Sequence, residues 1–388
     1  MSKLKPITIG SLIKKDLNDS YFLPAFPSSY SPGYRFNNDK KYRVYDCPPP
    51  SKVYSTVIYP SGFLPTVGDE VATLIDYDPP EFLLRHWKTW LPAFPTARLK
   101  TVDEGLKDDL LIVTNGPIQS IPVHKHSIDP DVHYQILRKS SLLDIDAPSP
   151  KNLTQENLSF PCVVKVDISW CGQGGCVVHN AKDLNDVLKE IRQENGWKDT
   201  IIFQEMIQGI KEVPSFQFYL QKSGDVHWIG TSVGGFDGLV WTGSVVDWNK
   251  QDYYKNLVYD EFVVPVVKYL HKQGYFGLVT IEILITDHGM YLVDMNPRVG
   301  GETSQLLLAP YMAQFNLTVS SFRVMNIASK TSASHVIEKA NDINNTHEGK
   351  VIVLSAADVD EKGCMFDVCV FAKTLDEVDA LCHKVSTF

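Results

Sequence analysis

Residues 278–298, Leu-Val-Thr-Ile-Glu-Ile-Leu-Ile-Thr-Asp-His-Gly-Met-Tyr-Leu-Val-Asp-Met-Asn-Pro-Arg, decide the fold. They contain two apolar runs, 278–285 and 290–295, joined by the turn residues Asp287-His288-Gly289. Two short β-branched and aliphatic runs around such a turn are typical of a β-hairpin. The stretch therefore predicts two antiparallel strands whose side chains alternate between two faces.

Three oxygen-bearing side chains converge in this hairpin. Residues two apart on a strand point to the same face, so Asp294 and Asn296 share a side, and the hairpin can bring Glu282 opposite them. Hard oxygen ligands suit Mg²⁺, with Mn²⁺ as an alternative, and such an ion binds nucleotide phosphates as further ligands. A solvent-facing strand edge is the other interpretation, but carboxylates amid apolar residues are costly to bury without a cation. Arg298 follows directly and offers a planar fork to a phosphoryl or carboxylate group.

A second constellation begins at residues 162–166, a predicted buried strand that Lys165 interrupts. The turn that follows, Ser169-Trp170-Cys171-Gly172-Gln173-Gly174-Gly175, is rich in glycine, and residues 176–179 read as the returning strand. Glycines let backbone N–H groups approach an anion closely, so the lysine and the turn together suit a polyphosphate under a flap. An edge-strand lysine before an ordinary hairpin is the alternative. The candidate contacts with the phosphates are Lys165, Ser169, Gly172, Gly174 and Gly175.

Other nucleotide and hydrolase motifs do not fit. No Gly-Lys-Ser/Thr closes the glycine-rich turn, and its glycines lack the spacing that opens a dinucleotide-binding helix. Residues 230–234, Gly-Thr-Ser-Val-Gly, match the string of a nucleophile elbow. An elbow requires a helix after the serine, whereas turn-forming residues continue here through Gly238, so a serine hydrolase is disfavoured.

Between the two constellations lies Phe203-Gln204-Glu205-Met206-Ile207-Gln208-Gly209, a strand that runs into a polar turn. Its exposed backbone could pair with an adenine edge, which makes Gln204, Glu205, Met206 and Ile207 candidates for adenine binding. Glu212 could accept hydrogen bonds from ribose hydroxyls, and an ordinary surface carboxylate is the equal alternative.

Composition narrows the class of protein. A chain of 388 residues can bury the cores of two or three domains. The net charge of -9 is spread along the chain without a basic run, so no nucleic-acid partner is expected. Residues 1–15 lack a continuous apolar segment and no later stretch has the length of a membrane span, so we expect a soluble cytoplasmic protein. The seven cysteines lack a disulfide framework and are expected to be reduced thiols.

The chain divides into three predicted parts. Residues 1–130 are expected to form an α/β domain of their own, residues 131–330 a central domain, and residues 331–388 a small α+β appendage. Within the last two parts the periodicity predicts helices at 133–143, 181–195, 260–273 and 375–384, and strands at 350–355 and 365–372.

The chain resembles the ATP-grasp superfamily over roughly residues 130 to 325. The features that carry the resemblance follow one another in this order: the strand lysine, the glycine-rich flap, the segment Gln204–Ile207, Glu282 and the run 294–298. Residues 213–219, 224–226 and 296–303 look like the pheganomycin-type peptide ligases within it. The resemblance implies an ATP-grasp fold in the α/β class: an N-terminal α/β domain and α+β subdomains, 131–203 with the flap and 204–330 with the metal site, that grip ATP between them.

The resemblance also implies roles for the matching residues. Lys165 would contact the ATP phosphates, Gln204 to Ile207 would line adenine, and Glu212 would hold ribose. Glu282, Asp294 and Asn296 would bind magnesium, and Arg298 would steady the transferred phosphoryl group. Two features depart from the family pattern: Asp294 stands where a glutamate is common, and the basic residue usual at the start of the helix here opened by His133 is missing, with Lys139 as a substitute.

The reaction implied is an ATP-dependent carboxylate–amine ligation through an acyl phosphate. The expected substrates are a carboxylate and an amine, the latter of an amino acid. The chain could also pair with a second copy of itself as a homodimer. Ligation to a thiol, such as that of a carrier protein, is the near alternative, and a non-catalytic ATP-binding regulator is the distant one. By position alone, the residues expected near the substrates are Arg298, Gly301, Glu302, Thr303 and Ser304.

Overall fold

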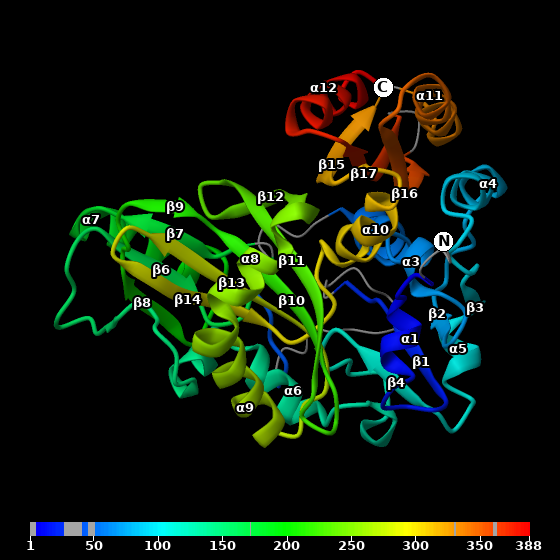
Figure 1. Cartoon of the computed structure of the whole chain (residues 1–388). Coiled ribbons are helices and arrows are strands. Elements are labelled where there is room, and N and C mark those ends of the chain that lie inside the picture. The colour runs from blue at the N-terminus through cyan, green and yellow to red at the C-terminus, as the bar shows by residue number, and fades with distance from the viewer. Residues whose placement is uncertain (1–4, 27–40, 46–50, 171, 330, 360–362) are drawn as a thin grey trace.

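A computed structural model describes residues 5–26, 41–45, 51–170, 172–329, 331–359 and 363–388. Three sheets organise these residues: a four-stranded parallel sheet near the N-terminus, a four-stranded antiparallel sheet, and a nine-stranded sheet in the middle (Figure 1). The predicted α/β fold class with α+β subdomains is confirmed. Cys171, in the glycine-rich turn, lies outside the described residues.

The N-terminal sheet has the strand order β3-β2-β1-β4 with parallel pairing throughout. Its strands are β1 (Ser20–Leu23), β2 (Ala72–Leu74), β3 (Arg98–Lys100) and β4 (Leu111–Thr114). The accompanying helices are α1 (Ile9–Ile13), α2 (Tyr59–Ser61), α3 (Leu64–Val67), α4 (Glu81–Trp90) and α5 (Val102–Gly105), with a π-helical turn (Tyr54–Ile58) and a 3₁₀ turn (Val123–Lys125). Parallel strands need such crossover connections, so strands and helices alternate here.

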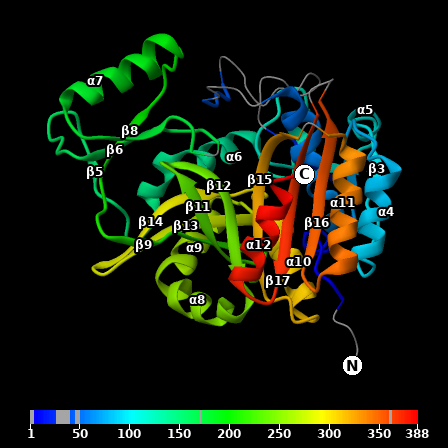
Figure 2. The same ribbon diagram turned by 90° about the horizontal axis from the view of Figure 1, so that it is seen from above.

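The small antiparallel sheet has the order β5-β8-β6-β7. Its strands are β5 (Asn152–Leu153), β6 (Cys162–Val166), β7 (Gly175–Val178) and β8 (Ile201–Glu205), and its helix α7 (Ala181–Lys189) continues into a π-helical turn (Glu190–Glu194). The hairpin predicted around the glycine-rich turn is confirmed, with Lys165 opposite Gly175. Figure 2 shows this sheet and α7 at one side of the molecule, away from the C-terminal helices.

The large sheet runs β14-β13-β10-β11-β12-β15-β17-β16, and β9 also pairs with β13. Its strands are β9 (Ile210–Glu212), β10 (Pro214–Leu220), β11 (Val226–Asp237), β12 (Val240–Asp247), β13 (Gly277–Thr286), β14 (Gly289–Asn296), β15 (Val319–Ser329), β16 (Lys350–Asp358) and β17 (Cys364–Ala372). The helices that go with it are α8 (Gln251–Val258), α9 (Val264–Lys272), α10 (Thr303–Ala313), α11 (Ala333–Thr346) and α12 (Leu375–Val385), with a 3₁₀ turn (Trp248–Lys250) and a π-helical turn (Tyr259–Val263).

The two faces of β10 and β13 differ in character, and this difference positions the site. One face packs its apolar side chains against α8 and α9; these are Phe216, Phe218, Ile281 and Ile283. Each such buried side chain contributes about 1.5–3 kcal/mol of hydrophobic stabilisation. The intervening residues therefore point to the opposite face, and they are polar: Ser215, Gln217, Thr280 and Glu282.

The C-terminal residues join the large sheet. The strands and the helix predicted there are formed as β16, β17 and α12, and β17 pairs with β15. The indole of Trp87 on α4 donates to the carbonyl of Val353 at 2.8 Å, so this segment also packs on the N-terminal part. The division of the chain at 130 and 330 remains an interpretation.

One predicted helix begins in the wrong place. The helix expected at 133–143 is α6 (Pro130–Leu137), followed by a 3₁₀ segment (Lys139–Asp144). Asp129 caps it by accepting hydrogen bonds from the N–H groups of Asp131 and Val132, and Pro130 suits the first helical turn.

Three further expectations concern a nucleophile elbow, the cysteines and membrane-spanning segments. Residues 230–234 lie within β11, so no nucleophile elbow forms there. The described cysteines, Cys162, Cys176, Cys364, Cys369 and Cys382, are free thiols. Within the described ranges, every helix is too short or too polar to span a membrane.

Candidate active site

Two adjoining clefts lie between the small sheet and the large sheet, with cavity volumes of about 270 Å³ and about 110 Å³. We call the larger the first cleft and the smaller the second cleft. They meet at a shared set of residues: Lys139, Gly172, Phe236, Leu239, Glu282 and Asp294. A ligand in one cleft therefore comes close to a ligand in the other.

The hairpin β13–β14 supplies the acidic centre of both clefts. Glu282 stands directly opposite Asp294, and Thr280 stands opposite Asn296, so all four side chains share one face. The Asn296 amide donates to Oδ2 of Asp294 at 3.2 Å. The expected convergence of the three oxygen-bearing side chains is thus confirmed as geometry, and their role as metal ligands remains a prediction.

Lys139 compensates part of this negative charge. Its Nζ lies 3.0 Å from Oδ1 of Asp294, and both side chains are mostly buried. Burial raises the pKa of Asp294, but the ammonium groups of Lys139 and Lys165 lower it more, so the net shift is downward. Burial and the adjacent Asp294 charge raise the pKa of Glu282 to about 8. The raised pKa of Glu282 shows that a second anionic carboxylate beside Asp294 is unfavourable here, and a divalent cation would relieve this.

Lys165 points from the small sheet into the first cleft. Its Nζ donates to the carbonyl of Val293 on β14 at 3.3 Å, which places the ammonium beside the strand that carries Asp294. Burial, aided by the neighbouring Lys139, lowers the pKa of Lys165 to about 8. A desolvated ammonium of this kind binds an anionic ligand strongly.

The glycine-rich turn closes against the tip of the hairpin β11–β12. Gly172 has a φ of +77°, and a Cβ at this position would lie 2.0 Å from the carbonyl oxygen of Leu239. Gly172 and Gly175 line the first cleft, and Ser169 lines the second. Gly174 lines neither, because a Cβ there would meet Val166 and Tyr45 on the other side, so its left-handed backbone serves the turn.

The segment predicted to bind adenine lines the first cleft as a continuous stretch: Gln204, Glu205, Met206 and Ile207. The Glu205 N–H donates to the carbonyl of Lys151 at 2.9 Å. Glu212 does not line the cleft, although Ile210 and Val213 on either side of it do. Its Oε2 accepts a hydrogen bond from the Tyr254 hydroxyl at 3.0 Å, and its predicted ribose contact is untested.

Arg298 forms the floor of the second cleft and is held by three contacts. It donates to the carbonyl of Val299 at 2.8 Å and to Oδ1 of Asn296 at 3.0 Å. Its Cζ lies 4.0 Å from the centre of the Trp170 ring. The guanidinium plane is therefore fixed before any substrate binds.

The substrate residues proposed by position divide into two groups. Gly301 and Glu302 line the second cleft. Thr303 and Ser304 do not, and their contact with a substrate remains a prediction. Thr303 accepts from the Gln217 amide at 2.9 Å, and the Ser304 hydroxyl donates to the carbonyl of Gly62 at 2.9 Å. Both begin helix α10, which is buried on every side, so their hydroxyls serve internal packing.

The sequence reasoning missed several residues of the site. His133 hydrogen-bonds through Nε2 to the carbonyl of Pro297 at 3.0 Å, next to Arg298. Burial lowers the pKa of His133 to about 4, so Nε2 belongs to a neutral ring and donates its hydrogen. Aromatic residues of the second cleft were also missed: Phe26, Tyr54, Tyr59, Trp170, Phe236 and Trp241. They come from distant parts of the chain, and no spacing in the sequence connects them.

The donor set at the centre fits Mg²⁺. Two carboxylates and an amide oxygen are hard ligands, and they leave positions for water and phosphate oxygens. In the described part of the chain no three His, Cys, Asp or Glu side chains gather as a metal cluster, because the third donor here is the amide of Asn296.

Comparison with known proteins agrees with this geometry. Residues 147–296 match the sequence model of an ATP-grasp family described as L-aspartate–L-methionine ligase. No curated protein sequence matches the chain.

Several solved structures resemble most of the fold. One is N5-carboxyaminoimidazole synthetase from Staphylococcus aureus complexed with ADP, at 13% identity and a TM-score of 0.53, covering 81% of this chain and 91% of that chain. Another is carboxyaminoimidazole ribonucleotide synthase from Aspergillus clavatus complexed with ATP, at 14% identity and a TM-score of 0.50, covering 81% and 90%. A third is the N5-carboxyaminoimidazole ribonucleotide synthetase from Thermotoga maritima, at 14% identity and a TM-score of 0.50, covering 81% and 91%. At these identities the likeness concerns the fold.

The class follows from these findings: residues 147–296 match an ATP-grasp ligase family, and the chain has the fold of ATP-grasp enzymes. The prediction of an ATP-dependent enzyme that forms C–N bonds is confirmed at this level. The narrower resemblance to the pheganomycin-type peptide ligases remains an interpretation of the sequence.

Proposed function

We propose that this chain uses ATP and Mg²⁺ to join a carboxylic acid to the amine of an amino acid, forming an amide and releasing ADP and phosphate. The family that matches residues 147–296 is described by two amino acids, aspartate and methionine, which supports amino acids as the substrate class. In this proposal the first cleft takes ATP, since it is the larger and contains the segment Gln204–Ile207.

A single observation carries the proposal: one cleft has a lysine on one wall and oxygen ligands on the other. Lys165 comes from the small sheet and reaches Val293 of β14, whereas Glu282 and Asp294 come from the large sheet. A polyphosphate between them would meet cationic groups on one side and metal ligands on the other. Mg²⁺ held by Glu282, Asp294 and Asn296 would supply positive charge to the phosphate oxygens.

The proposed reaction has two steps. A carboxylate oxygen of the first substrate attacks the γ-phosphorus of ATP, and the bond between that phosphorus and the β,γ-bridging oxygen breaks. The products of this step are an acyl phosphate and ADP. The amine nitrogen of the second substrate then attacks the acyl carbon, the C–O bond to phosphate breaks, and phosphate leaves while the nitrogen loses a proton. Lys165 and Lys139 hold the phosphates, and Arg298, already fixed against Trp170, steadies the transferred group.

Closure of the flap protects the acyl phosphate. Water would hydrolyse this intermediate, so the site must exclude it while the amine attacks. Gly172 approaches the carbonyl of Leu239 closely, and both residues line each cleft, so a closed flap would shield the junction of the two clefts.

The test is ADP release in the presence of a panel of amino acids as carboxylate and amine substrates, followed by mass spectrometry of the product. We expect particular pairs to stimulate ADP release and to give an amide; a thioester would indicate a thiol acceptor instead. Lys165→Ala and Asn296→Ala should remain folded and lose ADP formation, since both act on ATP. Lys182→Ala, an exposed lysine on α7, is the matched control and should keep it. Wild-type turnover in the first two variants would refute the assignments.

A further inference from the structure

The second cleft combines an aromatic wall with a buried carboxylate. Its rings come from three parts of the chain: Phe26, Tyr54 and Tyr59 from the N-terminal part, Trp170 from the flap, and Phe236 and Trp241 from the hairpin β11–β12. Only part of this cleft is shared with the first cleft, so it has a chemistry of its own. The charged side chains peculiar to it are Arg298 and Glu302.

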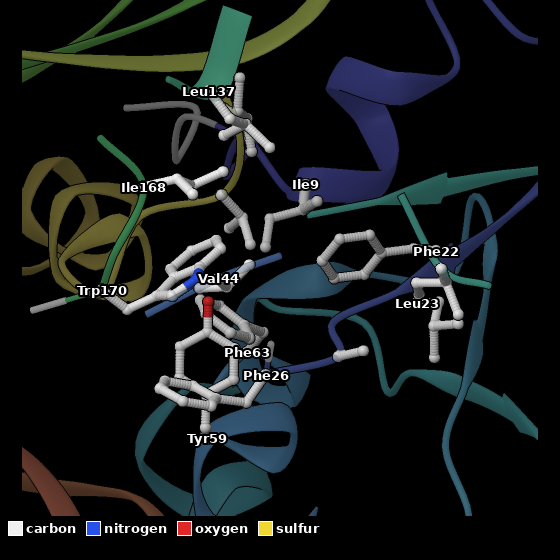
Figure 3. Close-up of a cluster of buried hydrophobic side chains, with 14 of the residues drawn as sticks. Ile9, Phe22, Leu23, Phe26, Val44, Tyr59, Phe63, Leu137, Ile168 and Trp170 are labelled. Atoms are coloured by element: carbon white, nitrogen blue, oxygen red, sulfur yellow. The ribbon is translucent and has the colours of Figure 1, made fainter. Parts of the chain in front are cut away.

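The N-terminal and flap rings form a preassembled apolar end. The ring centre of Phe26 lies 4.9 Å from that of Tyr59, 5.6 Å from that of Tyr54 and 6.2 Å from that of Trp170. Figure 3 shows Phe26, Tyr59 and Trp170 gathered in this way. Rings that pack on one another at these distances offer a rigid surface to an apolar group.

Glu302 lines the same cleft as Trp241 and lies next to Gly300. Its side chain folds back over Gly300, where a Cβ would stand 2.9 Å from both carboxylate oxygens. The ring of Trp241 lies over Gly301 in the same way, since a Cβ there would stand 2.9 Å from the indole. Two successive glycines therefore leave room for a carboxylate and an aromatic face at neighbouring positions of the backbone.

In the described parts of the chain, the charge of Arg298 and a hydrogen bond from the Thr280 hydroxyl compensate the Glu302 carboxylate in part, and burial still raises its pKa. It is 8% exposed, and in those parts no Lys, Arg or His nitrogen forms an ion pair with it within 4.0 Å. It occupies the N-cap position of α10, yet its side chain makes no capping hydrogen bond. A buried carboxylate is costly unless a cation or several donors satisfy it, so an ammonium group beside Glu302 would complete a compensation that Arg298 and Thr280 provide only in part.

A carboxylate next to an aromatic face recognises an ammonium group. The carboxylate accepts charge-assisted hydrogen bonds from the ammonium, and the ring face attracts the same charge. An amine that enters the cleft as an ammonium ion would satisfy both Glu302 and Trp241, while its apolar part would reach the rings around Phe26. The carboxylates shared by the two clefts, Glu282 and Asp294, would lie close to such an amine.

We propose that the second cleft binds the acceptor of the ligation through its ammonium group, held by Glu302 against Trp241, and that this acceptor carries a large apolar or aromatic side chain. That the bound amine is the acceptor of a ligation rests on the proposed function. The binding site itself is a statement about Glu302 and the rings, and it can be tested without turnover.

The experiment uses two probes of equal hydrocarbon size and opposite charge. Binding of 2-phenylethylamine, an ammonium ion, and of 3-phenylpropanoate, a carboxylate, is measured by calorimetry on the full chain. We expect the ammonium probe to bind the wild-type protein at least tenfold more tightly than the carboxylate probe. Glu302→Gln should weaken its binding at least tenfold, and Glu261→Gln, an exposed glutamate beside α9, should leave it unchanged.

A second variant keeps the test decisive if Glu302→Gln fails to fold. Trp241→Leu retains an apolar side chain and removes the aromatic face, and it should weaken binding of 2-phenylethylamine three- to tenfold. Equal binding of the two probes by the wild-type protein, or unchanged binding by the folded variants, would overturn the proposal.

Failure of the proposed function would give a different result. Wild-type protein incubated with ATP, hydroxylamine and a panel of amino acids should form hydroxamates if it makes acyl phosphates. Absence of hydroxamate with every amino acid would count against the proposed function, whereas the binding measurements would still decide the role of Glu302.

Discussion

Replacing Arg298 by lysine would separate the charge of this residue from its fixed geometry. Arg298→Lys keeps one positive charge but loses the donations to Val299 and Asn296 and the stacking on Trp170. The two hydrogen bonds contribute about 1 kcal/mol each and the cation–π contact about 0.5–1 kcal/mol. Because lysine retains part of these interactions, we expect the free energy of unfolding to decrease by about 1–2 kcal/mol. The effect on catalysis should be larger, because a preorganised donor at the reacting group contributes roughly 10²–10³ in rate.

The assay is kcat for ADP release with the best substrate pair, measured alongside urea unfolding. Arg192→Lys is the matched control, since Arg192 also donates two hydrogen bonds, in its case to the backbone carbonyls of Trp197 and Asp199, and lies outside both clefts. We expect both variants to lose similar stability and only Arg298→Lys to lose roughly a hundredfold in kcat. A wild-type kcat in Arg298→Lys, or an equal loss of kcat in the control, would refute the role assigned to the guanidinium.

Three further predictions concern the flap, the metal centre and acid stability. Gly172→Ala should force the flap from Leu239 and raise ATP hydrolysis without product, whereas Gly196→Ala, with φ +67° and no atom within 4 Å of the new Cβ, should not; equal behaviour would contradict the closure. Glu282 must lose a proton to bind Mg²⁺, and its pKa is raised to about 8, so the apparent Mg²⁺ affinity in ADP release should strengthen as pH rises from 6.5 to 8. A pH-independent affinity would count against this ligand. Burial lowers the pKa of His86 from 6.5 to about 4. As the pH falls below 6.5, His86 therefore takes up a proton in the unfolded chain before it does so in the folded protein. The free energy of unfolding should decrease by roughly 3 kcal/mol between pH 6.5 and 4. Denaturation of wild-type and His86→Asn proteins across this range should show a smaller pH effect in the variant, and parallel curves would exclude His86 as the cause.

The sequence predicted the centre of the site because that centre depends on local structure. The alternation of side chains along two strands joined by one turn predicted that Glu282 lies opposite Asp294. The register of β13 and β14 pairs these two residues. Lys165 was identified by the same logic, because a lysine in a buried strand needs a partner, and it reaches the carbonyl of Val293. Such patterns need only a few neighbouring residues, so they can be read from the chain directly.

The second cleft could not be predicted in this way. Phe26 and Trp170 are brought together by the packing of the N-terminal part on the flap, and no periodicity relates positions so distant in the chain. Thr303 and Ser304 were expected near the substrates by position alone, and they do not line the second cleft. Their hydroxyls instead bond to Gln217 and Gly62, and only the packing of α10 against both parts decides this.

The central claim is that the two sheets close over one nucleotide, with cationic side chains on one wall and metal ligands on the other. A crystal structure of the full chain with Mn²⁺ and a non-hydrolysable ATP analogue tests it most directly, because anomalous scattering locates the metal. We expect a Mn²⁺ ion within about 2.5 Å of oxygen atoms of Glu282 and Asn296, and the nucleotide phosphates beside Lys165. A nucleotide bound outside the first cleft, or a metal without contact to these side chains, would contradict it.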